Sequence, residues 1–154
     1  MDSQHAMPID INAARRNWMA ILARANAPEL EEASAGLLPA YTRLRGPEIG
    51  LVMVQARAGG TGAPFNLGEA TVARCTVRTG AGLVGHAYRL GRDTRAAELS
   101  AALDAALQDP AQHDAVQART IRPLADKQAA VRTQTASRAA ATQVNFFTLA
   151  TMRS

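Results

Sequence analysis

The sequence predicts an α+β fold: an antiparallel β-meander packed on helices, with an extended C-terminal helix and a terminal strand or tail. Two observations lead to this class. Side chains alternate in character over 49–57 and 70–78, which is the period of a strand. Segments 11–25 and 95–108 instead repeat apolar residues every three or four positions, which is the period of a helix. Because glycine-containing loops connect the strands, we expect an antiparallel sheet of about four strands.

Composition sets the outer bounds. The chain has 154 residues, of which 47% are hydrophobic and 19% are charged, so it is apolar enough for one packed domain over 1–154. Within it, 119–154 is expected to form a helical arm with an apolar tail. A single cysteine excludes an intrachain disulfide. We find neither a signal-peptide pattern nor an apolar run long enough to span a membrane, so the expected location is the cytoplasm.

The N-terminal third is expected to be helical. In the helix over 11–25, Trp18 occupies an apolar position and is expected to anchor the helix to the core. The adjacent Arg15 and Arg16 are then solvated, although a tryptophan beside two arginines is also consistent with stacking on a nucleic-acid base. Residues 40–45 indicate an edge strand, and Gly46-Pro47 indicates a turn that ends it.

Three extended runs follow, over 49–57, 68–78 and 83–90. In the second run Ala73, Cys75 and Val77 share one face, and Arg74 lies on the other. The first face is apolar, so we expect it to be buried, with Cys75 as a packed strand residue rather than a reactive thiol.

The connection between the first two runs carries the candidate chemistry. Glycines permit positive φ, and their successive N–H groups are able to form an anion-binding nest. The candidate anion-binding residues are Arg57, Gly59, Gly60, Thr61, Gly62 and Arg74. The alternative is a plain hairpin loop surrounded by exposed arginines. The pattern is neither a phosphate-binding P-loop nor a dinucleotide fingerprint, and neither a catalytic residue nor a metal site is predicted.

The last third contains a helix capped by Asp93, a poorly defined stretch over 111–118, and a long Ala-, Thr- and Gln-rich helix over 123–142. That helix has few large apolar residues, so it must be exposed or pack on another chain. The tail after it is rich in large apolar side chains, which either dock back as a strand or bind a partner. The candidate partner-interface residues are Phe146, Phe147, Leu149 and Met152.

Several of these segments together resemble the PhnG family, a subunit of the bacterial carbon–phosphorus lyase system. The resemblance rests on motifs in the right order over nearly the whole chain: Arg15-Arg16-Asn17-Trp18-Met19, the run from Gly50 through Gly59-Gly60-Thr61-Gly62, Arg74 with Arg78, Gly91-Arg92-Asp93 and Asn145-Phe146-Phe147-Thr148. The chain departs from the family pattern at Ala96, where a histidine is expected.

The resemblance implies a cytoplasmic core assembly with the subunits PhnH, PhnI and PhnJ and a second copy of this chain. That assembly displaces adenine from ATP with methylphosphonate and forms α-D-ribose 1-methylphosphonate 5-triphosphate. ATP and methylphosphonate are then substrates of the complex, the nucleosidase chemistry lies on PhnI, and this chain holds no cofactor.

Two functions from different classes follow from the sequence. The first is a non-catalytic subunit of this synthase, which predicts large exposed apolar surfaces on the single chain. The second is a stand-alone phosphate-binding module or small transferase that uses the Gly-rich loop, which predicts a closed pocket with convergent polar groups. A nucleic-acid binder is a weaker third hypothesis, since the basic residues lack interleaved aromatic residues.

Overall fold

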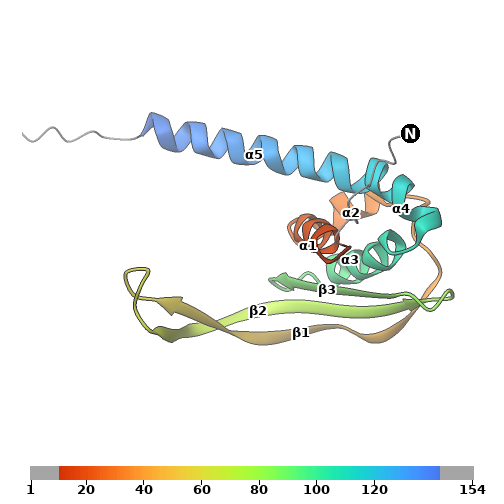
Figure 1. The fold of residues 1–154 in the computed structure, drawn as a ribbon, viewed down its shortest axis with the longest axis horizontal. Coiled ribbons are helices and arrows are strands. Elements are labelled where there is room, and N and C mark those ends of the chain that lie inside the picture. The colour runs from red at the N-terminus through yellow and green to blue at the C-terminus, as the bar shows by residue number, and fades with distance from the viewer. Residues whose placement is uncertain (1–10, 143–154) are drawn as a thin grey trace, which may run out of the picture.

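The computed structural model describes residues 11–142, which build up in layers (Figure 1). A three-stranded antiparallel sheet forms the base, one helix covers it, and the remaining helices pack above that helix. The elements are α1 (Ile11–Leu22), α2 (Ala27–Ala33), β1 (Tyr41–Arg57), β2 (Pro64–Thr79), β3 (Val84–Leu90), α3 (Thr94–Leu107), α4 (Pro110–Val116), a π-helical turn (Gln117–Ile121) and α5 (Arg122–Ala141). The predicted α+β meander is confirmed.

The sheet has the order β1-β2-β3. The edge strand over 40–45 and the turn at Gly46-Pro47 were predicted as separate features, and this prediction is wrong: both belong to one continuous β1. Gly46 adopts a φ of 66°, its peptide bond to Pro47 is cis, and the register to β2 shifts on both sides of Arg45. The register shifts absorb the extra residues within the strand, so the sheet of residues 11–142 has three strands rather than four.

Helix α3 is the central element, because every residue from Ala96 to Leu107 is buried. Its alanine-rich side lies on the sheet face formed by Ala73, Cys75 and Val77, as the alternation predicted. A Cβ atom on Gly85 of β3 would lie 1.9 Å from the Ala101 carbonyl oxygen. Only glycine therefore permits this close approach of strand and helix. Burial raises the pKa of the Cys75 thiol, which fits a packing role.

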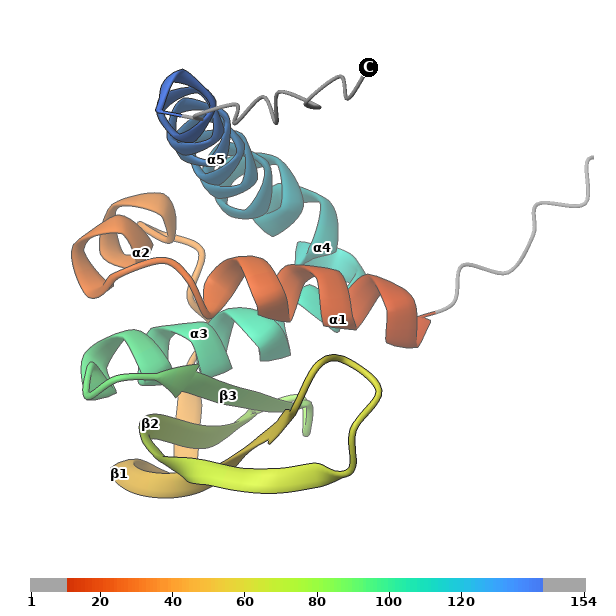
Figure 2. The ribbon, with the colours of Figure 1, turned by 90° about the vertical axis from the view of Figure 1, so that its left-hand side faces the viewer.

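The opposite side of α3 carries the larger apolar core. Leu99, Leu103 and Leu107 meet Trp18 of α1 and Leu30 of α2 there. Helix α1 was expected to pack on the sheet; instead it lies on the side of α3 that faces away from the sheet (Figure 2). Because α3 covers the apolar face of the sheet, α1 buries its own apolar side against α3 instead.

A buried carboxylate joins α1, α3 and β3. Asp104 is fully buried and accepts hydrogen bonds from Trp18 Nε1 (2.9 Å), from the backbone N–H of His86 (2.9 Å) and from Arg15 Nη2 (2.7 Å). The prediction that Trp18 anchors the helix to the core is confirmed. The expectation that Arg15 is solvated is wrong, because its guanidinium pairs with this carboxylate.

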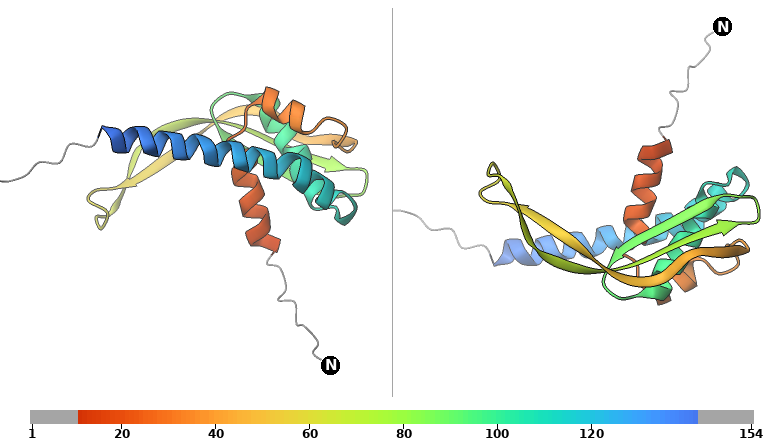
Figure 3. Two further views of the ribbon diagram at one scale, coloured as in Figure 1. Left: turned by 90° about the horizontal axis from the view of Figure 1, so that it is seen from above. Right: turned by 90° about the horizontal axis from the view of Figure 1, so that it is seen from below.

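Two elements project from this layered body in the same general direction (Figures 1 and 3). The first is α5, which confirms the predicted long helix: Leu124 is buried at its base, but each residue from Ala129 to Thr142 is exposed. We call 129–142 the helical arm. The stretch over 111–118, which the sequence left undefined, forms α4 and part of the π-helical turn that leads into α5.

The second projection is the part of β1 and β2 that extends beyond β3. The last β3 residue, Leu90, lies opposite Val72, so β2 continues past its neighbour. We call 51–57 and 64–71, which pair with each other, the distal ribbon. Its large apolar side chains are exposed by about half or more: Leu51 62%, Met53 54%, Phe65 47% and Leu67 65%.

Candidate functional site

The predicted Gly-rich loop lies at the tip of the distal ribbon. Gly59 and Gly60 have φ values of 61° and 79°, which explains why two successive glycines occur there. The Gly62 N–H donates to the Ala58 carbonyl oxygen at 3.1 Å. Arg57 Nη1 donates to the Gly62 carbonyl oxygen at 3.3 Å, so this arginine stabilises the loop. Thr61 lies in the same loop, between Gly60 and Gly62. The structure thus brings together five of the six predicted anion-site residues.

The sixth residue, Arg74, lies elsewhere. Its Nε donates to Glu48 Oε1 at 2.7 Å and its Nη1 to the Tyr88 hydroxyl at 3.3 Å, on the sheet face away from α3. Both hydrogen bonds, the one to Tyr88 first, raise the pKa of Arg74. Glu48 and Arg57 are nine positions apart on an extended strand, a separation of roughly 30 Å. Arg74 is therefore not part of the loop, and anion binding by the loop stays a prediction.

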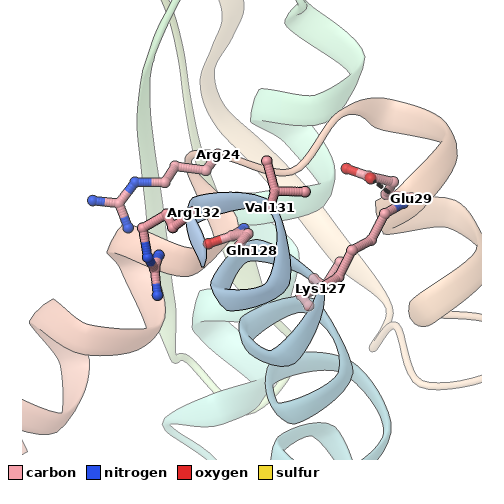
Figure 4. Close-up of a pocket in the computed structure, with 7 residues that line it drawn as sticks. Arg24, Glu29, Lys127, Gln128, Val131 and Arg132 are labelled. Atoms are coloured by element: carbon pink, nitrogen blue, oxygen red, sulfur yellow. Dashed lines mark hydrogen bonds and ion pairs between the residues drawn. The ribbon is translucent and has the colours of Figure 1, made fainter. Parts of the chain in front are cut away.

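A second candidate site is a cleft between α5, the end of α1 and the start of α2 (Figure 4). Its volume is about 390 Å³, within the range of ligand and peptide-side-chain pockets. It is lined by Arg24, Glu29, Leu124, Lys127, Gln128, Val131 and Arg132. We call these seven residues the α5 cleft.

Local sequence places each wall of this cleft. Asn26 caps α2 in a capping box with Glu29, which fixes the Glu29 side chain at the start of that helix. Arg89 of β3 is buried and donates to the Ala25 carbonyl oxygen at 2.6 Å, which holds the chain just after α1, beside Arg24. A cation at the end of a helix is favoured by the exposed carbonyl groups there. Burial lowers the pKa of Arg89.

Charge in the α5 cleft is unevenly distributed. Lys127 Nζ forms an ion pair with Glu29 Oε1. The pKa of Glu29 is lowered, first by its hydrogen bond from Lys127 and then by that from the Asn26 N–H. Arg24 and Arg132 have no ion-pair partner within residues 11–142. Figure 4 shows their guanidinium groups on the same side of the cleft, away from Glu29. The cleft therefore has one neutralised wall and one cationic wall.

Between these walls the floor is largely apolar. Leu124 is buried, while Val131 is 56% exposed. Gln128 donates from Nε2 to the Ile21 carbonyl oxygen at 2.9 Å, and its buried Oε1 has no hydrogen-bond partner in the part of the chain that the structure describes. Sequence reasoning missed this cleft because its two arginines come from opposite ends of the chain: Arg24 follows α1, and Arg132 lies on α5. The helical period placed Arg24 and Arg132 on helices but contained no signal that the helices meet.

Other predicted features are simpler to place. Among residues 11–142, no group of His, Cys, Asp and Glu has the arrangement of a metal site, and no helix is long and apolar enough to cross a membrane. The predicted tail interface (Phe146, Phe147, Leu149 and Met152) lies outside the described residues.

Comparison with known proteins identifies the family. The family model for the phosphonate metabolism protein PhnG matches residues 13–152, which is nearly the whole chain. The chain belongs to the PhnG family. It is also 46% identical over 139 residues to the α-D-ribose 1-methylphosphonate 5-triphosphate synthase subunit PhnG of Rhizobium meliloti (strain 1021), a match that covers 89% of this chain and 88% of that relative. The resemblance inferred from the sequence motifs is confirmed.

The structure accounts for one departure of this chain from the PhnG family pattern. Ala96 stands where the resemblance implies a histidine, and it is fully buried on α3 within the core that contains Trp18 and Leu99. In this PhnG-family chain the position contributes to packing. The stand-alone phosphate-binding module or transferase, by contrast, finds no support in these comparisons, since the similar protein is named as a subunit.

Proposed function

We propose that this chain is the non-catalytic PhnG subunit of an α-D-ribose 1-methylphosphonate 5-triphosphate synthase in phosphonate catabolism. In this role it binds other subunits, and the assembled complex displaces adenine from ATP with methylphosphonate. The observation that carries the structural side of this proposal is the distal ribbon, with its four half-exposed apolar side chains. The named relative supports the enzyme to which the subunit belongs.

The apolar side chains of the distal ribbon favour a bound partner. Fully burying one large apolar side chain contributes roughly 1.5–3 kcal/mol. Covering the exposed half of four such side chains therefore contributes roughly 3–6 kcal/mol before the cost of association. This free energy is gained when a partner covers the side chains, and it is not gained while they remain in water. Apolar side chains clustered on one projecting element are typical of protein–protein interfaces.

The backbone of the distal ribbon supports the same conclusion. Among the strands of residues 11–142, β1 is an edge strand along its whole length, and β2 has no β3 neighbour over 64–71. Unpaired N–H and C=O groups along an edge are a template for an added strand. A partner that contributes a strand here would satisfy these groups and cover the apolar side chains at once.

The proposed partners are the PhnH, PhnI and PhnJ subunits and a second copy of this chain, in the cytoplasm. ATP and methylphosphonate bind to the complex, with the nucleosidase chemistry on PhnI, and this chain contributes no cofactor. Neither a membrane nor nucleic acid is part of the proposal.

Co-expression tests the proposal directly. A tagged copy of this chain is co-expressed with PhnH, PhnI and PhnJ and purified. The mass of the purified assembly is then measured by native mass spectrometry. We expect a stable complex, and we expect Leu51→Glu with Leu67→Glu to prevent it, because two charges then replace apolar contacts. Leu44→Glu is the matched control: Leu44 is 49% exposed on the same β1 but outside the distal ribbon. Purification of the chain alone, with the three partners expressed and soluble, would refute the subunit role.

A further inference from the structure

We infer that the α5 cleft and the helical arm together form a docking groove for an acidic, amphipathic helix of a partner subunit. This inference rests on the proposed subunit role and adds to it a second surface, the chemistry of the segment that binds there, and the residues that select it.

The helical arm gives the first reason. From Ala129 to Thr142 every residue is exposed, so this part of α5 gains little stabilisation from packing on the rest of residues 11–142. A helix of this length is marginal in water even when it is rich in alanine. Thr133 and Thr135 also donate from their hydroxyls to the carbonyls of Ala129 and Val131, a local hydrogen bond that does not favour a long exposed helix. Contact with another protein supplies the missing packing.

The shape of the arm indicates a helix as the occupant. Beyond the cleft, one open side of α5 continues from it and shares Lys127 and Val131 with it. That side is formed by Lys127, Ala130, Val131, Thr133, Gln134, Ser137 and Arg138. Most of these positions are three or four apart, so they form one stripe on the helix. The small side chains of Ala130 and Ser137 on that stripe permit a partner helix to approach closely, while Val131 offers it an apolar contact.

Charge indicates which helix fits. The α5 cleft and this side of α5 together contain four cations, Arg24, Lys127, Arg132 and Arg138, against a single carboxylate, Glu29. Glu29 is already paired with Lys127, so Arg24, Arg132 and Arg138 remain without an ion-pair partner among residues 11–142. A guanidinium group binds carboxylates in a bidentate fashion, and its charge repels a basic partner. The groove therefore selects a segment with Asp or Glu on one side and apolar residues on the other.

The cleft end of the groove fixes the position of that segment. Arg24 lies on the well-packed body and Arg132 on the projecting helix, and their guanidinium groups lie on the same side of the cleft (Figure 4). A carboxylate placed between them links body to arm, while an apolar side chain beside it covers Val131 above the buried Leu124. This geometry orients the partner along α5.

Charge reversal in the co-expressed complex tests the inference. One variant carries Arg24→Glu with Arg132→Glu, and a second carries Arg138→Glu, whose site on the exposed arm leaves the folded core untouched. The control is Arg16→Glu, a reversal at an exposed arginine of α1 outside the groove. We expect the double variant to bind the other subunits roughly 30-fold more weakly, since loss of a well-placed charge pair costs 2 kcal/mol or more. Arg138→Glu is expected to show a smaller loss, and the control none.

The outcomes separate this inference from the proposed function. If the unmodified chain forms the complex and both groove variants assemble as the control does, the groove inference is overturned and the subunit role stands. If the unmodified chain forms no complex, both are overturned. If assembly is unchanged but binding of ATP or inorganic tripolyphosphate is lost in the double variant, the cleft is a small-anion site and the docking inference is wrong. Restored assembly when one acidic residue of the partner is changed to arginine supports it directly.

Discussion

Replacing Asp104 with alanine is expected to destabilise the chain more than any exposed substitution. Asp104 of α3 is fully buried, and its two oxygens accept hydrogen bonds from α1 and from β3. Alanine removes both oxygens and leaves Trp18 Nε1 and the His86 N–H without an acceptor between α1, α3 and β3. The position of α1, and with it Arg24 in the α5 cleft, depends on this junction.

The size of the effect follows from these contacts. Each buried N–H left without an acceptor costs about 1–3 kcal/mol. The Arg15 side chain is 30% exposed, so water partly replaces its lost partner and its contribution is smaller than that of a fully buried ion pair. Together these terms predict a loss of about 3–5 kcal/mol in the free energy of unfolding. The total free energy of unfolding of a domain of this size is about 5–15 kcal/mol.

Urea unfolding followed by circular dichroism measures this loss. With a slope of about 2 kcal/mol per molar urea, the midpoint falls by roughly 2 M. Asp104→Asn keeps one acceptor oxygen and is expected to fall between the wild type and the alanine variant. Asp114→Ala, at an exposed position of α4, is the control and is expected to change stability by less than about 0.5 kcal/mol. Equal midpoints for the Asp104→Ala and Asp114→Ala variants would show that the carboxylate does not join the layers.

Three further predictions concern the fold, its pH dependence and the tail. Gly85→Ala is expected to cost at least about 2 kcal/mol, because the new Cβ meets backbone of α3 at 1.9 Å, whereas Gly80→Ala, with no atom within 4 Å, is expected to be neutral in the same urea assay. Burial alone would raise the pKa of Glu98, but hydrogen bonds from Arg43 and Tyr41 outweigh it and hold that pKa below 4.5. The stabilisation from Glu98 is therefore complete above pH 4.5 and lost as the pH falls through the lowered pKa. Unfolding measured over a series of acidic pH values should then show a shallower loss for Glu98→Gln than for the wild type; equal slopes would contradict the assignment. Deletion of 143–154 is expected to leave the folded body intact, by circular dichroism, and to weaken assembly with the other subunits; normal assembly of the truncated chain would show that the tail is not an interface.

The sequence alone determined the secondary structure of most of the chain, because that structure depends on local patterns. Strict alternation over 70–78 placed Ala73, Cys75 and Val77 on one face, and the structure buries them under α3. Helical spacing placed Trp18 in the core, and the scarcity of large apolar residues in α5 predicted its exposure. The family was also determined at this level, since its motifs are read directly from the chain.

Only the tertiary structure decided how distant segments combine. Arg74 was predicted to help the Gly-rich loop bind an anion, but the strand register places Arg74 opposite Glu48 and Tyr88, far from the tip. Gly46-Pro47 has the local pattern of a turn, yet pairing with β2 on both sides keeps it within one strand.

The same limit applies to the buried carboxylate and to the α5 cleft. Arg15 and Asp104 are 89 positions apart, and no periodicity within either helix indicates that they meet. Arg24 and Arg132 face one cleft only because α1 and α5 pack against the same core beside α3. Local patterns specify which face of an element is buried; the partners on that face depend on the packing of whole layers, to which every element contributes. In this PhnG-family chain, that packing brings Arg24 and Arg132, which are distant in the sequence, to the same side of the α5 cleft.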